Sequence, residues 1–287
     1  ADVRQSVESV TGEDFRAFFE QWISRTGAPV LAMDRVRVDG PSASGVHTIT
    51  GALVQRQDAA AYQLAVPLIV GTVDGQSSFL VEISSEATDF SVRVDASPEV
   101  IAVDPGFDVF RVLDPLETPA SVGQIFGEGS VLAILPADED ASGYELLLDV
   151  WRNDQHRIDV VLDTDIDSLP ADRSVWILGE TNRFADVVRQ RSHRPDGVPQ
   201  VLLGDETIEL SGHSIMIVRR HPENEEKAVG WIAIDPRTAF SGFARKLRHY
   251  GKYSYLAFSG DEPTNIAKGQ WDTPESPLVH EFVPGAS

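Results

Sequence analysis

The sequence predicts a chain of mixed class: an N-terminal helix, an antiparallel β-sandwich, and then a three-layer α/β domain with a mostly parallel sheet. Three observations support this prediction. Large apolar residues recur at helical spacing near residue 20, short strands with hairpin turns follow, and strands then alternate with amphipathic helices. We expect a helical lead-in at 1–27, a sandwich at 28–113, a linker at 114–129 and the α/β domain at 130–287.

The lead-in is expected to carry one amphipathic helix with a strong apolar stripe. Thr11 is expected to open this helix with Asp14 at the capping-box offset, and Gly27 followed by Pro29 is expected to end it. A stripe of this size needs a surface to pack against, so we expect a domain interface there. The interface residues are Phe15, Phe18, Phe19 and Trp22.

Seven short strands are expected in the sandwich, because alternating apolar residues are separated by turn signals. Asp74-Gly75 is the strongest hairpin signal, since this pair favours a two-residue turn. The expected strands lie at 30–38, 47–55, 62–72, 77–84, 89–94, 100–103 and 109–113.

The α/β prediction rests mainly on the stretch 229–269, where two apolar runs of strand length flank an amphipathic helix. This is the βαβ pattern of a parallel or mostly parallel sheet. Asp235 is expected to cap the helix and Pro236 to occupy its first turn. The tail from 271 is expected to be irregular. Other strands are expected at 131–135, 158–162, 175–178, 201–203, 207–210 and 215–218, and helices at 144–152 and 183–190.

Composition and charge limit the classes of function. The chain has 287 residues with 24 basic and 45 acidic side chains, a formal net charge of −21, and no cysteine. The lack of cysteine excludes disulfides and thiolate metal sites. The negative field repels nucleic acid and anionic lipid, so we expect no nucleic-acid partner. The apolar runs are of strand length, so we expect no membrane insertion.

No catalytic or metal-binding motif is complete. His280-Glu281 begins the H-E-x-x-H pattern of zinc peptidases, but Pro284 occupies the position of the second histidine. An acidic run at 163–167 resembles the start of a calcium loop, but the glycine and glutamate that such a loop requires are missing. A phosphate-binding glycine loop and a nucleophile elbow are also missing. We therefore expect no catalytic residue and no metal ligand in this chain.

Polar clusters follow the expected strands of the α/β domain. Because carboxyl ends of parallel strands meet at one edge, where ligands bind, these clusters could line a crevice for a peptide or small ligand. The alternative is that they are caps and turn formers, which strand–helix junctions need regardless of function. The expected ligand-binding residues are Glu180, Asn182, Asp261, Glu262, Asn265 and Lys268. A further alternative is an unrecognised hydrolase that uses Glu180, Asp261 and His249.

Two parts of the sequence resemble the M1 family of zinc aminopeptidases. The stretch 18–31, F-F-E-Q-W-I-S-R-T-G-A-P-V-L, resembles the junction where the last helix of the catalytic domain enters a β-sandwich. The strand-rich stretch that follows, with Asp104-Pro105 near its end, is similar to that sandwich. The block 245–265 resembles the end of some bacterial M1-like peptidases, although an α/β pattern stands here where better-known members have a helical superhelix.

The resemblance implies a non-catalytic C-terminal accessory region that supports or gates the active site of a zinc peptidase domain upstream of Ala1. The family's zinc-binding motif, its downstream glutamate ligand and its glycine-rich recognition motif have no counterparts here. Zinc is therefore expected only in the upstream domain, which would be a partner within the same polypeptide. The localisation is unknown from the residues themselves, and the resemblance favours a periplasmic, envelope-associated or secreted parent protein. A free-standing binding module that uses the crevice remains the alternative function.

Overall fold

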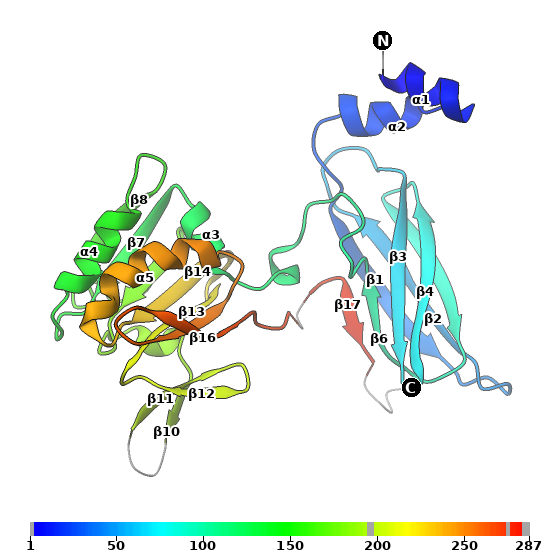
Figure 1. Ribbon diagram of the computed structural model, residues 1–287. Helices are drawn as coiled ribbons and strands as arrows, with labels where there is room; N and C mark the ends of the chain where they lie inside the picture. Colours follow the sequence, from blue (N-terminus) through cyan, green and yellow to red (C-terminus); the bar gives the residue numbers. More distant parts are fainter. Residues whose placement is uncertain (1–2, 194–197, 274–275, 283–287) are drawn as a thin grey trace. The chain divides into compact units, whose positions relative to one another are not determined.

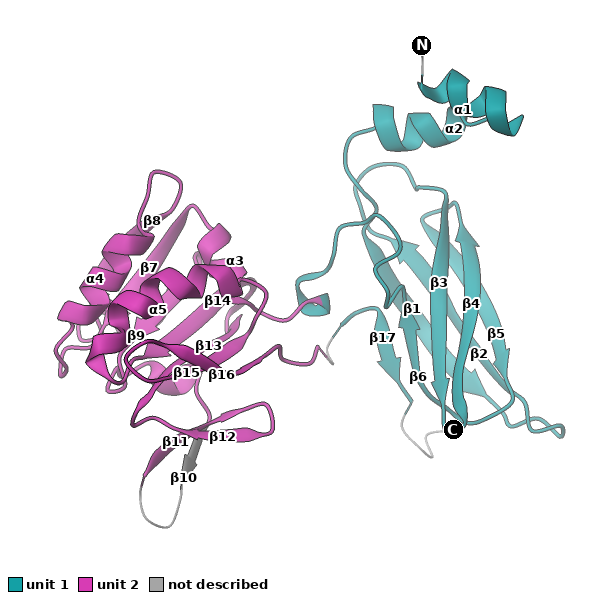
Figure 2. Cartoon of the chain, in the orientation of Figure 1, with its two compact units in different colours: residues 1–117, 274–287 teal, residues 118–273 magenta. Residues whose placement is uncertain are grey.

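The computed structural model describes residues 3–193, 198–273 and 276–282. The chain divides into two compact units (Figure 2): unit 1 holds residues 1–117 and 274–287, and unit 2 holds residues 118–273. Unit 2 is therefore inserted into unit 1, because the chain returns to unit 1 after leaving it. The expected division assigned the whole tail to the α/β domain, and the structure differs at this point.

The return of the chain is made by strand β17 (Val279–Glu281), which pairs with β6 (Pro98–Val103). Leu278, beside this strand, is 1% exposed and belongs to the sandwich core. The tail was expected to be irregular because a three-residue strand carries too few residues to show a period of two. Its partner strand, far away in the sequence, decides its structure.

Unit 1 is an antiparallel β-sandwich (Figure 1), as predicted. One sheet has the order β1-β2-β5 and the other β17-β6-β3-β4, and their inner faces share one apolar core. The hairpin at Asp74-Gly75 is confirmed, since Thr72 pairs with Gly75 across the β3–β4 turn. The remaining strands are β1 (Leu31–Asp39), β2 (His47–Gln55), β3 (Leu64–Thr72), β4 (Gly75–Ile83) and β5 (Ala87–Val94).

The seventh expected strand, at 109–113, does not form, because a buried ion cluster folds this segment back. Arg111 Nε donates to Asp104 Oδ2 at 2.8 Å, and Nη1 donates to Glu117 Oε2 at 2.8 Å. The guanidinium is buried together with both carboxylates. Burial alone lowers the pKa of Arg111, but the hydrogen bonds to the two carboxylates outweigh it and the pKa is raised. The cluster fixes residues 104–117, including the 3-10 turn Pro115–Glu117, on the sandwich.

The lead-in contains three short helical segments rather than one helix: α1 (Val3–Thr11), α2 (Arg16–Phe19) and the π-helical turn η1 (Glu20–Ser24). Thr11 ends α1 and does not open the next helix. The prediction missed this break because the Asp14 carboxylate, instead of completing a capping box, accepts from the Arg16 amide at 2.9 Å and binds the Arg16 guanidinium. The chain therefore turns before α2 begins.

Unit 2 is built on one seven-stranded sheet of order β16-β15-β13-β14-β9-β7-β8. The pairings give β8, β7, β9, β14 and β15 one direction and β13 and β16 the other, so the sheet is mostly parallel, as predicted. The strands are β7 (Ser130–Leu135), β8 (Arg157–Leu162), β9 (Val175–Leu178), β13 (His213–His221), β14 (Asn224–Ala233), β15 (Tyr255–Ser259) and β16 (Thr264–Gly269).

Helices cover one face of this sheet and mostly irregular chain covers the other (Figure 1). The helical layer consists of α3 (Val122–Gly127), α4 (Ser142–Trp151) and α5 (Phe240–Leu247). The opposite layer includes the 3-10 turn Ala185–Val187, where a helix at 183–190 was expected, and a small sheet. That sheet consists of β10 (Arg191–His193), β11 (Pro199–Leu203) and β12 (Glu206–Glu209).

Two details of unit 2 differ from the sequence prediction. The expected linker at 114–129 contains α3, whose buried Val122 and Ile125 belong to the core beneath the helices. Asp235 does not cap the helical segment that follows it, because its Oδ2 accepts from the amide of Gly212 at 2.5 Å. The N-cap position of the 3-10 turn Arg237–Ala239 is Pro236. In both places, contacts with residues distant in the sequence determine the structure, and the local sequence pattern does not show these contacts.

One buried residue, Ser254, bridges the first and last segments of unit 2. Ser254 Oγ donates to the carbonyl of Ala120 at 2.6 Å and accepts from the amide of Trp271 at 3.3 Å. Ser254 is fully buried, so the first and last segments of the insertion are held together. Among the described residues, no helix is long and apolar enough to cross a membrane.

Candidate functional site

The carboxyl ends of five strands meet at one edge of the unit 2 sheet, where the polar clusters were predicted to converge. Glu180 and Asn182 follow β9, while Asp261 and Glu262 follow β15. Two strands, β13 and β14, lie between β9 and β15. At roughly 4.8 Å per strand, the two groups are about 14 Å apart. The predicted residues share an edge but form two separate groups.

Two of the predicted ligand-binding residues donate their side-chain hydrogen bonds to the backbone. Asn182 is 2% exposed, and its Nδ2 donates to the carbonyls of Ile134 and Leu178, both at 3.0 Å. These bonds tie the ends of β7 and β9 together. Asn265 Nδ2 donates to two carbonyls beside the bulge between β15 and β16, at 2.9 and 3.1 Å. The cap-and-turn interpretation accounts for both amides.

The two acidic residues after β15 belong to a turn. The Asp261 carboxylate accepts a hydrogen bond from the hydroxyl of Thr238, at the start of the helical segment after β14. Glu262 is exposed, and its backbone carbonyl accepts from Thr264 Oγ1 at 3.2 Å. This turn is therefore held by local hydrogen bonds that need no ligand.

Lys268 and His249 lie towards the other end of the sheet, where the parallel strands begin. Strand β16 is antiparallel to β15, so Lys268 lies near the start of β15. Its Nζ is 5.5 Å from the ring centre of Tyr253, a residue that precedes β15. His249 lies in the 3-10 turn Arg248–Tyr250, which follows α5 and contacts α3. Because α3 directly precedes β7, this turn lies at the end of the sheet where the parallel strands begin. The structure therefore separates His249 from Glu180 and Asp261, the other members of the expected hydrolase site.

Glu139, which was not among the predicted site residues, also makes three hydrogen bonds at the carboxyl ends of these strands. Its Oε2 accepts from the amides of Glu180 and Thr181 at 3.1 and 3.4 Å and from the Thr181 hydroxyl at 3.3 Å. Gly179 has a φ of +98°, and a Cβ there would lie 2.9 Å from the same oxygen. Burial first, and the nearby Glu139 carboxylate second, raise the pKa of Tyr144. Glu139 thus fills the space between the strand ends.

The lead-in meets the sandwich at a second candidate site, which we call the lead-in junction: residues 15–25, the loop 56–63 and the segment 107–113. Tyr62 is 1% exposed, and the ring of Trp22 stacks on it at 5.4 Å between centroids. The Arg25 guanidinium carbon lies 3.5 Å from the same ring centre. Arg25 also donates to the carbonyls of Ala60 and Ala61. Stacking and cation–π contacts of this kind attach the lead-in firmly to the sandwich.

Amide side chains complete this attachment. Gln21 donates to the carbonyl of Gln63 at 3.0 Å and accepts from its amide at 2.8 Å, which mimics a backbone pair. Gln55, 2% exposed, makes the same exchange with Tyr62, donating at 2.9 Å and accepting at 2.7 Å. Gln57 donates to the Gln55 side chain at 3.2 Å. The loop 56–63 is therefore held from both sides.

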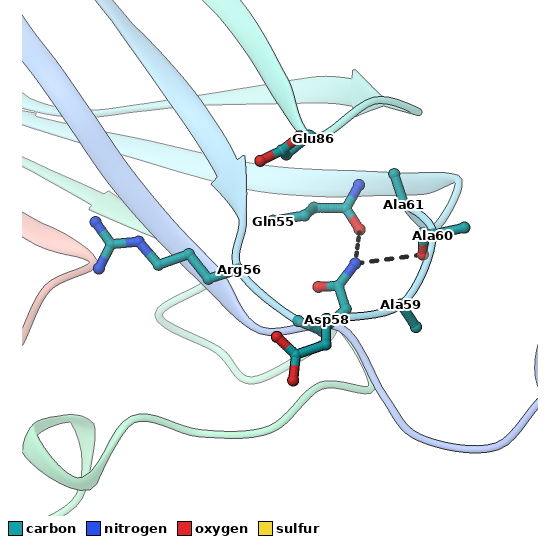
Figure 3. A pocket seen from close by; sticks show the side chains of 8 residues that line it. Gln55, Arg56, Asp58, Ala59, Ala60, Ala61 and Glu86 are labelled. Atoms are coloured by element: carbon teal, nitrogen blue, oxygen red, sulfur yellow. Dashed lines mark hydrogen bonds between the residues drawn. The ribbon is translucent and has the colours of Figure 1, made fainter.

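Two open hollows flank this loop. The first, of about 410 Å³, is shown in Figure 3, where the dashed lines join Gln57 to Gln55 and Ala60. It is lined by residues 55–61 and Glu86. The second, of about 430 Å³, lies between the loop and the lead-in and is lined by Ala17, Glu20, Gln21, Ser24, Arg25, Ala61 and Gln63. Among the lining residues, Gln21, Arg25, Gln55 and Gln57 donate side-chain hydrogen bonds that hold the loop.

The lead-in junction also exposes apolar side chains. Phe18 is 53% exposed and Ile23 is 72% exposed, although both neighbour the docked Trp22 in sequence. Phe110, 72% exposed, touches Trp22 edge-on at 5.8 Å and extends this surface to the segment 107–113. Of the four predicted interface residues, Trp22 is docked on the sandwich, Phe18 faces outward, and Phe15 and Phe19 are half-buried.

Within the described ranges, no group of three or more histidine, cysteine, aspartate or glutamate residues could hold a metal ion. Comparisons with known proteins add no identification: no protein-family model matches this chain, and no curated protein matches it significantly.

Proposed function

We propose that this chain is a non-catalytic accessory region of an M1-like zinc aminopeptidase, and that the lead-in junction is where the catalytic domain packs. The proposal joins the sequence resemblance, whose residues 18–31 form this junction, with the exposure of its apolar side chains. The catalytic zinc and all catalytic residues would belong to the partner domain.

The observation that carries the proposal is the contrast between Trp22 and its neighbours Phe18 and Ile23. Trp22 is stacked on the sandwich and held beside Gln21 and Arg25, so the lead-in has a fixed orientation. Phe18 and Ile23 therefore remain exposed on a rigid base rather than on a mobile tail. Grouped exposed apolar side chains of this kind are typical of protein interaction surfaces.

A support role is favoured over a ligand-binding role at the carboxyl edge of unit 2. There, the amides of Asn182 and Asn265 and the carboxylate of Glu139 are engaged in backbone hydrogen bonds. At the lead-in junction, by contrast, apolar surface remains uncovered. The accessory function therefore accounts for the exposed apolar side chains of the lead-in junction.

The first test is the size of the natural gene product, detected by immunoblot of source-cell extract with an antibody against this chain. We expect a band well above the 31.4 kDa of the chain itself. The purified chain, supplied with zinc, should not hydrolyse aminoacyl substrates. A natural product of 31.4 kDa, or zinc-dependent hydrolysis by the chain alone, would contradict the proposal.

A second test addresses the surface itself. In the longer natural product, Phe18→Asp combined with Ile23→Asp should weaken the packing of the catalytic domain and lower its thermal stability. Arg93→Gln is the control, because Arg93 is exposed on β5 of unit 1 and lies outside the lead-in junction. Equal stability of the double variant and the control would place the interface elsewhere.

A further inference from the structure

Strand β1 contains a bulge that changes which side chains face outward. Asp34 pairs with Ala52 and Arg37 with Thr50, so the two residues 35 and 36 lie opposite the single residue Gly51. Met33 and Val38 on either side pack against the sandwich core. In a regular strand residue 35 would also face the core, since side chains alternate. The bulge instead places Val36 against the core.

Arg35 occupies the bulge in a conformation that glycine normally takes. Its φ is +54°, in the left-handed region that costs conformational energy for any residue with a Cβ. The side chain is exposed, and Nη2 donates to Asp89 Oδ1 of β5 at 2.8 Å. The guanidinium thus reaches across the outer face of the sheet β1-β2-β5. The strand pairings on both sides of the bulge hold Arg35 in this conformation.

The bulge borders an open hollow of about 480 Å³ on this outer face, which we call the arginine hollow. Two arginines, two hydroxyl side chains and one carboxylate line it, together with Gly51 and Phe90: Arg35, Arg37, Thr50, Ser91 and Asp89. Within the part of the chain that the structure describes, the Arg37 guanidinium has no hydrogen-bond or ion-pair partner. The Arg35–Asp89 pair is exposed on both sides and therefore exchanges readily with another acceptor.

The geometry points to an oxyanion site: the arginine hollow binds the phosphate or sulfate group of a small soluble molecule. Guanidinium groups donate paired hydrogen bonds to such oxyanions, and the two hydroxyls supply further donors. The volume is in the range of small-molecule sites. The net charge of −21 repels anions from most of the surface, so an anion-binding function requires a local pair of cations such as this one.

The test is titration of the full chain with sodium sulfate and with sodium phosphate against sodium chloride at matched ionic strength, followed by amide NMR. We expect saturable shifts at residues 35–37, 50–51 and 89–91. Arg37→Gln should weaken the apparent affinity at least about tenfold, since a charge-assisted bond is lost. Arg35→Gly should also weaken binding while raising the melting temperature without anion, because glycine relieves the strain at φ +54°.

Arg16→Gln is the matched control, because it removes one exposed arginine of unit 1 outside the hollow and should leave the affinity unchanged. Shifts that do not saturate, or that are equal in the native chain, Arg37→Gln and Arg16→Gln, would overturn the proposal. Saturation by acetate but not by sulfate or phosphate would overturn the assigned ligand class. Arg37-dependent co-sedimentation with phosphatidylglycerol vesicles would overturn the assignment to a small soluble molecule.

Discussion

The carboxyl edge of unit 2 and the lead-in junction of unit 1 use their functional-looking residues in opposite ways. At the carboxyl edge, the polar side chains of Asn182, Asn265 and Glu139 are engaged within the fold. At the lead-in junction, Trp22 is engaged, but Phe18 and Ile23 are left exposed. Polar residues at strand ends can satisfy neighbouring backbone groups, whereas the Phe18 ring meets Phe15 and Phe19 only edge-on and stays 53% exposed.

The difference teaches that residue type alone does not separate structural from interacting residues. An asparagine after a strand suits a ligand site and a backbone bridge equally well, because both use the same amide donors. A structural residue has its hydrogen-bonding groups or its apolar surface engaged within the fold, whereas an interacting residue leaves them exposed. The following predictions test this comparison, beginning with the largest expected effect.

Arg111→Met should destabilise unit 1 by about 3–5 kcal/mol, because it leaves the buried carboxylates of Asp104 and Glu117 without their cation. The free energy of unfolding from denaturant titration measures this effect. Arg93→Gln, which removes an exposed arginine of β5, should leave the unfolding midpoint unchanged. A small effect of Arg111→Met would mean that segment 104–117 is not a fixed part of the lead-in junction.

Asn182→Ala should destabilise unit 2 by about 1–3 kcal/mol, since the carbonyls of Ile134 and Leu178 lose their buried donor. Glu262→Ala, at an exposed residue predicted for the same site, should have little effect on stability. Hydrogen exchange of the β7 and β9 amides distinguishes this loss from an effect on unit 1. If Asn182→Ala were neutral, its amide would be free for a ligand and the comparison would fail.

Trp22→Ala should destabilise unit 1 by about 1–2 kcal/mol, because it removes the stack on Tyr62 and the edge contact with Phe110. Phe18→Ala should change stability by less than about 0.5 kcal/mol, since its ring is mostly exposed. Thermal unfolding of the isolated chain measures both. Equal losses would show that Phe18 is part of the core and not of an interaction surface.

The smallest expected effect is on the pKa of Asp14, which the hydrogen bonds from Arg16 lower to about 2 from its ordinary 3.8. The ionised carboxylate is favoured in the folded chain, so its contribution is present above about 3.8 and is lost as the pH falls through 2. In Arg16→Gln, NMR titration should show the pKa of Asp14 moving up towards 3.8. The Asp140 pKa, lowered mainly by Ser142, should not move.

Several sequence predictions were confirmed because the local pattern is sufficient to determine the structure. Strand β2 at His47–Gln55, the hairpin at Asp74-Gly75 and the apolar strand β9 were all predicted within one residue or better. The direction of the α/β sheet followed from the pattern around α5. At the candidate site, the same patterns predicted that Glu180 and Asp261 lie at the same end of the sheet. They did not predict the distance between the two residues.

By itself, the sequence determined the fold class, because periodic burial of apolar side chains requires only neighbours along the chain. Only the tertiary structure decided the pairing of β17 with β6, the engagement of Asn182 and the outward position of Arg35. Each of these depends on a partner distant in the sequence: the edge of β6, the carbonyl of Ile134, and the outer face of β5. Such contacts form when the chain folds back on itself, so no local spacing specifies them.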